Sequence, residues 1–233
     1  MTSIHIPARR AGAALLLLLA IPALGGCTDG SELHPGDAAV VAGERISLDK
    51  VDDLALATCA LEERGLSQQG VVVPMSFVRS LAAETLVTDV LIEEFAKEHD
   101  VDLADVRSGV RGEAEKAIAD LPDSQQASAL DRLSLEGVRR SVLQIVGSTE
   151  PGGKASPDAA GAAGRTAFAE FRKDADVVRD PRFGDVDLDT FQFSGASGSL
   201  SVAVDPSSDA MDQAAIAELP AGQRCGTPAA PQQ

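Results

Sequence analysis

The spacing of Ser47 and Lys50 is the first place where this sequence could carry chemistry. Residues 47–50 fit the pattern S-x-x-K, in which the serine can act as a nucleophile. The K-T-G sequence that accompanies this pattern in enzymes does not follow, and Ser47 directly precedes a run of apolar residues at helical spacing. A serine at that position accepts a hydrogen bond from a backbone N–H of the first helical turn. We therefore expect a helix cap at Ser47 and no nucleophile.

Three alternating carboxylates are the next candidate, as a cation site. Asp185, Asp187 and Asp189 could share a calcium ion. An EF-hand loop that began there would need glycine where Thr190 stands and glutamate where Ala196 stands. We interpret the three residues as a solvated acidic face and expect no metal site.

Nucleotide binding and hydrolytic triads lack their partner residues. Gly153-Lys154 ends like a P-loop, but Ser148 replaces the first glycine and Ala155 replaces the hydroxyl residue. After residue 26 the chain has two histidines, His34 and His99, and neither has a cysteine or histidine at ligand spacing. We expect no catalytic residue, no cofactor and no bound metal, and hence a protein that is not an enzyme.

The first 26 residues have the features of an export signal. Arg9 and Arg10 precede an apolar run at residues 11–24 that is too short to span a bilayer, and the sequence LGGC then ends at Cys27. This ending resembles the bacterial lipobox, in which the chain is cleaved before the cysteine and the thiol is joined to diacylglycerol. The resemblance implies a lipoprotein anchored through Cys27 on the extracytoplasmic face of the cell membrane; an uncleaved membrane helix or a coincidental cysteine is the alternative.

The charge of the chain excludes several kinds of partner. The formal net charge is −16, and loss of residues 1–26 would remove two arginines and no acid. Such a protein is repelled by nucleic acid and by anionic lipid head groups, so we expect no nucleic-acid partner and membrane attachment through the lipid alone. The chain has neither Trp nor Tyr, which disfavours a carbohydrate-binding surface.

Two cysteines remain if Cys27 carries a lipid. An even number in an oxidising compartment suggests a disulfide between Cys59 and Cys225, which would tie the first helix to the C-terminal tail. Two separate thiols, one of them buried, are an equally weighted alternative.

The apolar periodicity predicts a mainly helical fold with a small β element. Val40, Val41 and Ile46 suggest one short strand with a bend, followed by an amphipathic helix after Ser47. Further helices are expected to begin at N-caps along the middle of the chain: Ser76, Asp102 with Asp105, Ser124 and Ser134.

The later part of the chain should complete the same domain. Residues 148–164 contain no large apolar side chain and suggest a flexible linker, whereas residues 165–173 suggest a helix with Phe168 and Phe171 on one side. Extended segments at 175–179 and 199–204 are the expected partners of the first strand. The resulting division is a signal peptide (1–26), a tether (27–37), a strand and helical body (38–147), a linker (148–164), a completing helix and strands (165–205), and a tail (206–233) that is weakly ordered except near Cys225.

The order of these parts resembles the SurA/PrsA family of extracytoplasmic folding factors. The likeness rests on the lipobox, on AVVAGERISLDKVD at residues 39–52, on KDADVV and DPRFG within residues 173–184, and on SLSVAV at residues 199–204. Members have an N-terminal helical chaperone region completed by a C-terminal helix and strand, often with a parvulin-type prolyl isomerase domain inserted between them. Residues 148–164 occupy that position and are too few for such a domain.

The resemblance implies a SurA N-terminal-like chaperone body without the isomerase. We therefore expect a lipoprotein that binds unfolded or secreted proteins; a structural adaptor of the cell envelope that binds one folded partner is the alternative. Met75, Phe77, Phe168 and Phe171 are candidates for an apolar client groove, although core packing is the favoured reading of each, so no client-binding residue is assigned.

Overall fold

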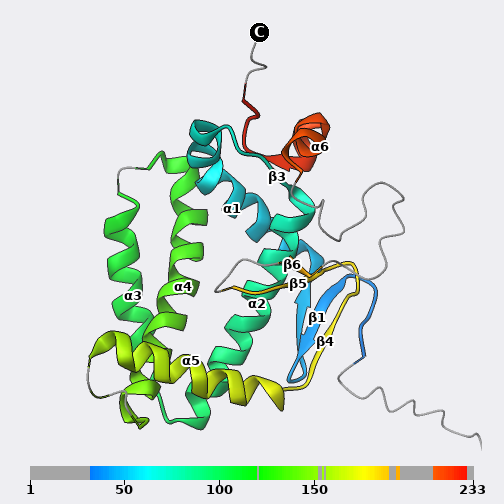
Figure 1. Ribbon diagram of the computed structural model, residues 1–233. Coiled ribbons are helices and arrows are strands. Elements are labelled where there is room, and N and C mark those ends of the chain that lie inside the picture. Colours follow the sequence, from blue (N-terminus) through cyan, green and yellow to red (C-terminus); the bar gives the residue numbers. More distant parts are fainter. Residues whose placement is uncertain are drawn as a thin grey trace, which may run out of the picture.

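The computed structural model describes residues 32–119, 121–151, 154, 156–188, 193–194 and 212–229 (Figure 1). The expected signal peptide, the lipidation site Cys27 and the expected strand at residues 199–204 lie outside the described residues. Asp189, the third member of the acidic triplet, also lies outside them.

The fold is mainly helical, as the periodicity predicted. In Figure 1, α3, α4 and α2 stand side by side, α5 crosses their lower ends, and a small antiparallel sheet lies beside α2 on the side away from α3. The helices are α1 (Leu48–Gln69), α2 (Met75–Glu98), α3 (Leu103–Ala117), α4 (Asp123–Thr149), α5 (Pro157–Lys173) and the short α6 (Gln213–Glu218).

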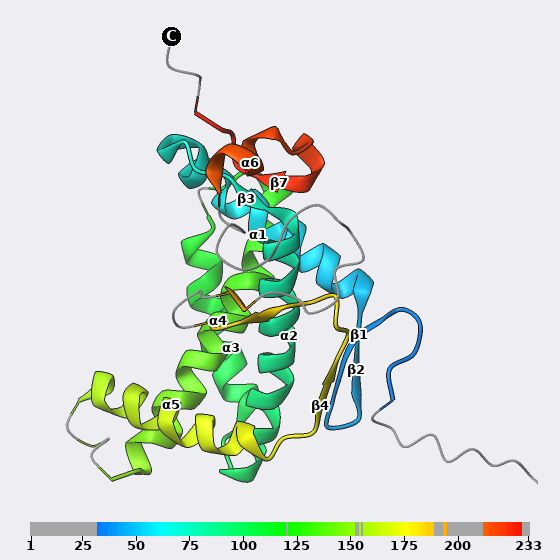
Figure 2. The same ribbon diagram turned by 45° about the vertical axis from the view of Figure 1, so that its right-hand side comes forward.

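The main sheet joins the first two strands to a strand that follows α5. Its order is β2 (Glu44–Ser47), β1 (Asp37–Val41) and β4 (Val177–Arg179), all antiparallel, with Val40 opposite Val178 (Figure 2). The expectation that residues 175–179 would pair with the first strand is therefore confirmed for β4. The shorter strands are β3 (Val73–Pro74) with β7 (Arg224–Cys225), and β5 (Asp185–Val186) with β6 (Phe193–Ser194).

The prediction of one bent strand at residues 40–46 is wrong, because the chain forms a hairpin there. Ala42 and Gly43 form the turn with φ angles of 49° and 83°. Both lie in the left-handed region, and a two-residue loop with two positive φ angles matches the twist of the flanking strands. Ser47 then caps α1 as predicted, since its hydroxyl accepts a hydrogen bond from the Lys50 N–H at 3.2 Å.

The expected tether extends too far, because its last residues belong to the fold. Asp37 begins β1, and its carboxylate accepts a hydrogen bond from the His34 N–H at 2.8 Å and pairs with Arg45. The hydrogen bond from the His34 backbone, together with Arg45, lowers the pKa of Asp37. The chain is thus fixed against the β1–β2 hairpin from His34 onward.

The prediction of a flexible linker at residues 148–164 is also wrong at both ends of that range, since residues 148–149 and 157–164 are helical. α4 continues to Thr149, and α5 begins at Pro157 with Ser156 as its cap. The small residues serve close packing between these helices: a Cβ at Gly147 would lie 1.8 Å from the Ala160 carbonyl oxygen. A Cβ at Gly164 would lie 1.8 Å from a carbonyl oxygen of α4 in the same way. The small residues that suggested a linker therefore form one face of a closely packed helix pair.

Two predicted helix starts differ from the structure. The helices expected at Ser124 and Ser134 form one continuous helix, α4, since no proline or glycine interrupts residues 123–136. α2 begins at Met75, and its N-cap, Pro74, lies two residues before the predicted cap Ser76. The cap at Asp102 is confirmed: its carboxylate accepts the N–H groups of residues 104 and 105 at 2.9 and 3.3 Å.

The buried core forms two clusters that share α2. One cluster packs the hairpin and α1 against the first half of α2, through residues such as Val41, Val51 and Val87. The other packs the end of α2 against α4, through Phe95 and Val142. Because α2 contributes to both, it fixes the sheet relative to α3, α4 and α5.

Candidate functional site

The C-terminal segment is more ordered than expected and is fastened to the end of α1. Residues 212–229 contain α6, a short 3-10 helix (Ala221–Gln223) and β7. The Gln213 side chain accepts a hydrogen bond from the Val72 N–H at 2.8 Å and donates one to the Val72 carbonyl at 2.9 Å. A side-chain amide here replaces the pairing that a neighbouring strand would give to Val72. The expectation of a weakly ordered tail is wrong for these residues.

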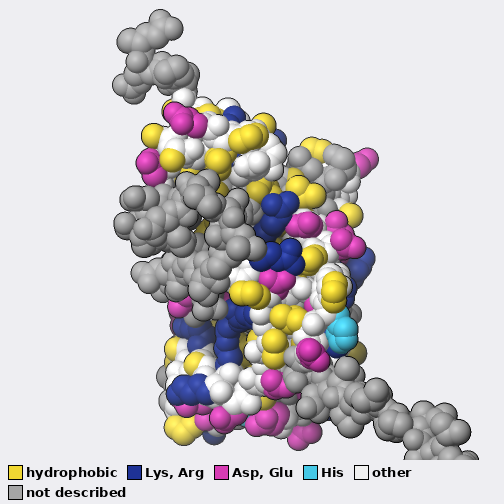
Figure 3. Space-filling model, turned by 90° about the vertical axis from the view of Figure 1, so that its right-hand side faces the viewer, with side chains coloured by type: hydrophobic (Ala, Val, Ile, Leu, Met, Phe, Trp, Pro, Cys, Tyr) yellow, Lys and Arg dark blue, Asp and Glu magenta, His cyan; other side chains and the backbone are white. Residues whose placement is uncertain are grey.

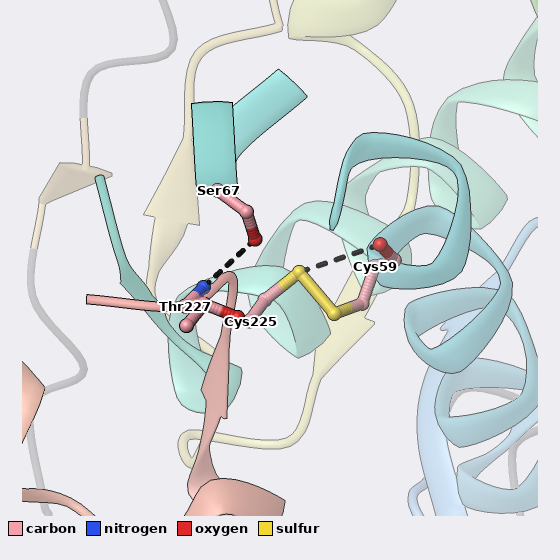
Figure 4. The surroundings of a disulfide bond; sticks show 4 residues. All are labelled: Cys59, Ser67, Cys225 and Thr227. Carbon is pink, nitrogen blue, oxygen red and sulfur yellow. Dashed lines mark hydrogen bonds between the residues drawn. A yellow bond between two sulfur atoms is a disulfide. The ribbon is translucent and has the colours of Figure 1, made fainter. Parts of the chain in front are cut away.

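Cys59 of α1 and Cys225 of β7 are joined in a disulfide, with their Cα atoms 5.6 Å apart (Figure 4). The Thr227 N–H also donates to the Ser67 hydroxyl at 3.0 Å, so two bonds hold the C-terminal segment against one helix. Cys225 is almost fully buried beside Met75 in the core. The open choice between a bond and two thiols is resolved in the structure as a bond.

A buried carboxylate connects α2 with α5 and β4. Glu84 is only 2% exposed, and its two oxygens lie 2.6 Å from guanidinium nitrogens of Arg172 and Arg179. The Thr88 hydroxyl donates to the same carboxylate at 3.3 Å. One negative charge is therefore held between two positive ones, which offsets the cost of burying it.

Sequence reasoning missed Glu84, although the helix pattern contained a signal. Glu84 lies on the same side of α2 as Ser80, Val87 and Leu91, all of which are buried. An acidic residue in the middle of a buried helix face requires a compensating cation. Its position in the sequence, however, does not show which arginine supplies the charge.

A groove of about 960 Å³ lies between the C-terminal ends of α2 and α5 and reaches the turn of the β1–β2 hairpin. Leu91 and Phe95 form its bottom and are almost completely buried. The walls are partly exposed apolar side chains, among them Phe171, Ala167 and Ala175. A groove with this lining can take apolar side chains of a polypeptide without enclosing them.

The four apolar residues proposed from the sequence have different positions. Phe171 lines the groove, with its ring centroid 5.3 Å from that of Phe95. Phe168 packs 5.4 Å from Phe95 and supports the groove from inside. Met75 is buried in the core near Cys225, away from the groove, and Phe77 is half-buried near the start of α2. Only Phe171 therefore remains a candidate for direct contact.

The rim of the groove is acidic. Its two lysines form ion pairs within their own helices: Lys97 with Glu94 at 3.5 Å, and Lys173 with Glu170 at 2.7 Å; His99 also lines the groove. Three further rim carboxylates have no ion pair among the described residues, and all three are exposed: Glu98, Asp174 and Asp176.

The face that carries the sheet has a different charge pattern. Figure 3 shows Lys and Arg side chains gathered there beside acidic and hydrophobic ones. Arg79 pairs with Asp52 at 2.6 Å, and Arg182 pairs with Asp180 and by its hydrogen bonds lowers the pKa of that carboxyl. These arginines are neutralised locally and do not form a free basic patch.

A small cavity of about 30 Å³ lies between α2 and α4 beside Asp89. This volume holds about one water molecule, so the cavity is too small for an organic ligand. Burial, with the nearby negative charges of Glu93 and Glu44, raises the pKa of Asp89 to about 6, while Arg107 acts in the opposite direction. The raised pKa of Asp89 makes the stability of the fold depend on pH.

Within the described ranges, no three His, Cys, Asp or Glu side chains are grouped so that they could hold a metal ion. Of the helices that the structure describes, none combines the length and the apolar character needed to cross a bilayer.

Comparisons with models of known protein families, with curated proteins and with solved structures found no match to this chain.

Proposed function

We propose that this chain is a membrane-anchored extracytoplasmic lipoprotein that binds unfolded segments of secreted proteins without acting on them chemically. Lipid on Cys27 would hold it at the membrane, and the helical body would be a SurA N-terminal-like chaperone region without an isomerase. The completion of the first strand by β4, directly after α5, supports this reading. So does the short connection between α4 and α5, at the position where members of the SurA/PrsA family often carry the isomerase.

The groove between α2 and α5 is the observation that carries the proposal. It is open along the surface, has an apolar bottom and is bordered by charged side chains. Such a site binds short apolar stretches weakly and releases them, as a folding factor requires, because little client surface is buried at a time. The acidic surface would keep the complexes dispersed.

Fluorescence offers a direct test because the chain contains no Trp. The full chain, purified as the cell processes it and reconstituted in zwitterionic liposomes, is mixed with an unfolded client that carries Trp. We expect the Trp emission to shift to the blue and aggregation of the client to fall at stoichiometric amounts. Unchanged emission together with unchanged aggregation would refute the chaperone proposal.

A pair of alanines on α5 provides matched variants. Ala167 lines the groove, whereas Ala162 is exposed on the same helix, so Ala167→Gln fills the site and Ala162→Gln does not. We expect only Ala167→Gln to weaken client binding, since the helix propensities of the two variants are equal. Crosslinking in cells adds a second criterion: many unfolded clients support a folding factor, while one folded protein would favour the adaptor alternative.

A further inference from the structure

We propose that the groove between α2 and α5 selects unfolded segments in which Lys or Arg flanks an apolar side chain. This inference rests on the proposed function and specifies its client. It follows from the distribution of charge around the groove.

The acids of the rim outnumber its lysines. The two lysines are each paired with a glutamate three residues earlier on the same helix, so the positive charge of each is balanced within its own helix. Glu98 at the end of α2, and Asp174 and Asp176 after α5, have no such partner in the described part of the chain. They stand on both sides of the groove and leave it with a negative surplus.

The helix ends add to this surplus. α2 ends at Glu98 and α5 ends at Lys173, and both ends border the groove. The C-terminal end of a helix carries a partial negative charge because its peptide dipoles are aligned. Two such ends therefore converge where the three carboxylates stand, and a cation gains from all of these charges together.

The apolar lining determines the rest of the client chemistry. Leu91, Phe95 and Phe171 offer contact to an apolar side chain, while the acids lie at the edges of the same groove. A bound segment can place an apolar side chain against Phe171 and its flanking cations against Asp174, Asp176 or Glu98. Segments with flanking acids are repelled by the same carboxylates.

Three labelled peptides with one apolar core test the inference, with flanks of Lys, of Ser or of Glu. Binding to the full chain in zwitterionic liposomes is followed by fluorescence anisotropy at low and at high salt. Two or three exposed charge pairs should make the Kd of the Lys peptide on the order of tenfold lower than that of the Ser peptide. The Glu peptide should bind most weakly, and the differences should shrink toward high salt, where the Debye length is about 3 Å at 1 M.

Matched charge variants locate the effect. Glu98→Gln, Asp174→Asn and Asp176→Asn together should bring the Lys and Ser peptides to similar Kd values without abolishing binding. The control replaces three exposed acids of α1 that also lack ion pairs among the described residues: Asp53→Asn, Glu62→Gln and Glu63→Gln. This control variant changes the net charge of the protein by the same amount as the rim variant and should leave most of the preference for the Lys peptide intact.

The outcomes separate the two proposals. Equal binding of the three peptides at low salt overturns the selectivity and leaves the chaperone proposal standing. The selectivity is also overturned if the α1 control variant removes the preference for the Lys peptide as fully as the rim variant does. In that case the whole acidic surface, and not the groove, would be the cause. Absence of binding by every peptide, with no protection of an unfolded client, rejects both.

Discussion

Glu84 of α2 lies 2.6 Å from Arg179 of β4, and this ion pair connects the central helix with the strand that completes the sheet. Arg172 of α5 approaches the other oxygen of the same carboxylate at the same distance. The buried Glu84 side chain thus holds α5 and β4, the two elements on either side of residues 174–176. These three residues form one wall of the groove.

Removal of the negative charge at Glu84 should destabilise the fold. Glu84→Gln keeps the shape of the side chain but removes the buried negative charge that Arg172 and Arg179 both approach. We expect the free energy of unfolding to fall by about 2–4 kcal/mol. Urea unfolding followed by far-UV circular dichroism measures it, since the chain has no Trp.

The control for Glu84 is an exposed ion pair of the same chemistry. Glu115 pairs with Arg111 at 2.8 Å on α3, and both side chains are more than half exposed. Glu115→Gln should cost less than about 1 kcal/mol because water and salt screen that pair. Equal losses for the two variants would contradict the role given to Glu84.

Gly164→Ala should destabilise the protein although alanine is the better helix former. The new Cβ would meet a backbone oxygen of α4 at 1.8 Å, so α4 and α5 must separate. We expect a loss of about 2 kcal/mol in the free energy of unfolding. Gly112→Ala on α3 is the matched control: its Cβ meets nothing within 4 Å, and the change should stabilise by about 0.5–1 kcal/mol.

Loss of the disulfide should lower stability and release the C-terminal segment first. The bond joins cysteines 166 residues apart, and it restricts the unfolded chain correspondingly. The double variant Cys59→Ala, Cys225→Ala should lose about 2–5 kcal/mol. Hydrogen exchange should show the largest gain in residues 212–229; two reactive thiols at these positions in the unreduced protein would argue against the bond.

Asp89 should make the fold less stable as pH rises. Its pKa is about 6 in the folded state against 3.8 for an ordinary aspartate, so the folded protein binds the extra proton between these values. Stability therefore falls as pH increases from about 4 to 6 and stays lower above that window. Asp89→Asn should raise the free energy of unfolding at pH 7.5 by about 1–3 kcal/mol.

The same variant should give little gain at pH 4, where Asp89 is protonated in the folded protein. Urea titrations at both pH values provide the comparison. A gain that is equal at the two pH values would show that ionisation of Asp89 is not its cause.

Local features could be predicted from the sequence because their causes are local. The caps at Ser47 and Asp102 require only a side-chain oxygen ahead of an apolar periodic run, and both are present. The pairing of residues 177–179 with β1 was also expected, because a strand must find a partner for its backbone groups. In the same way, the apolar periodicity indicated a mainly helical fold.

Tertiary structure decided the features that depend on contact between distant residues. Gly164 belonged to a segment whose composition suggested a linker, but the close approach of α4 and α5 makes it, with Gly147, part of a helix interface. Helical spacing placed Phe171 on an apolar side of its helix, but it did not place the acids of α2 next to it. The groove exists because the ends of α2 and α5 meet. Glu84 illustrates the physical reason for this division between local and tertiary features. A buried charge shows from the sequence that a partner is needed, but only the packing of distant elements brings Arg172 and Arg179 to it.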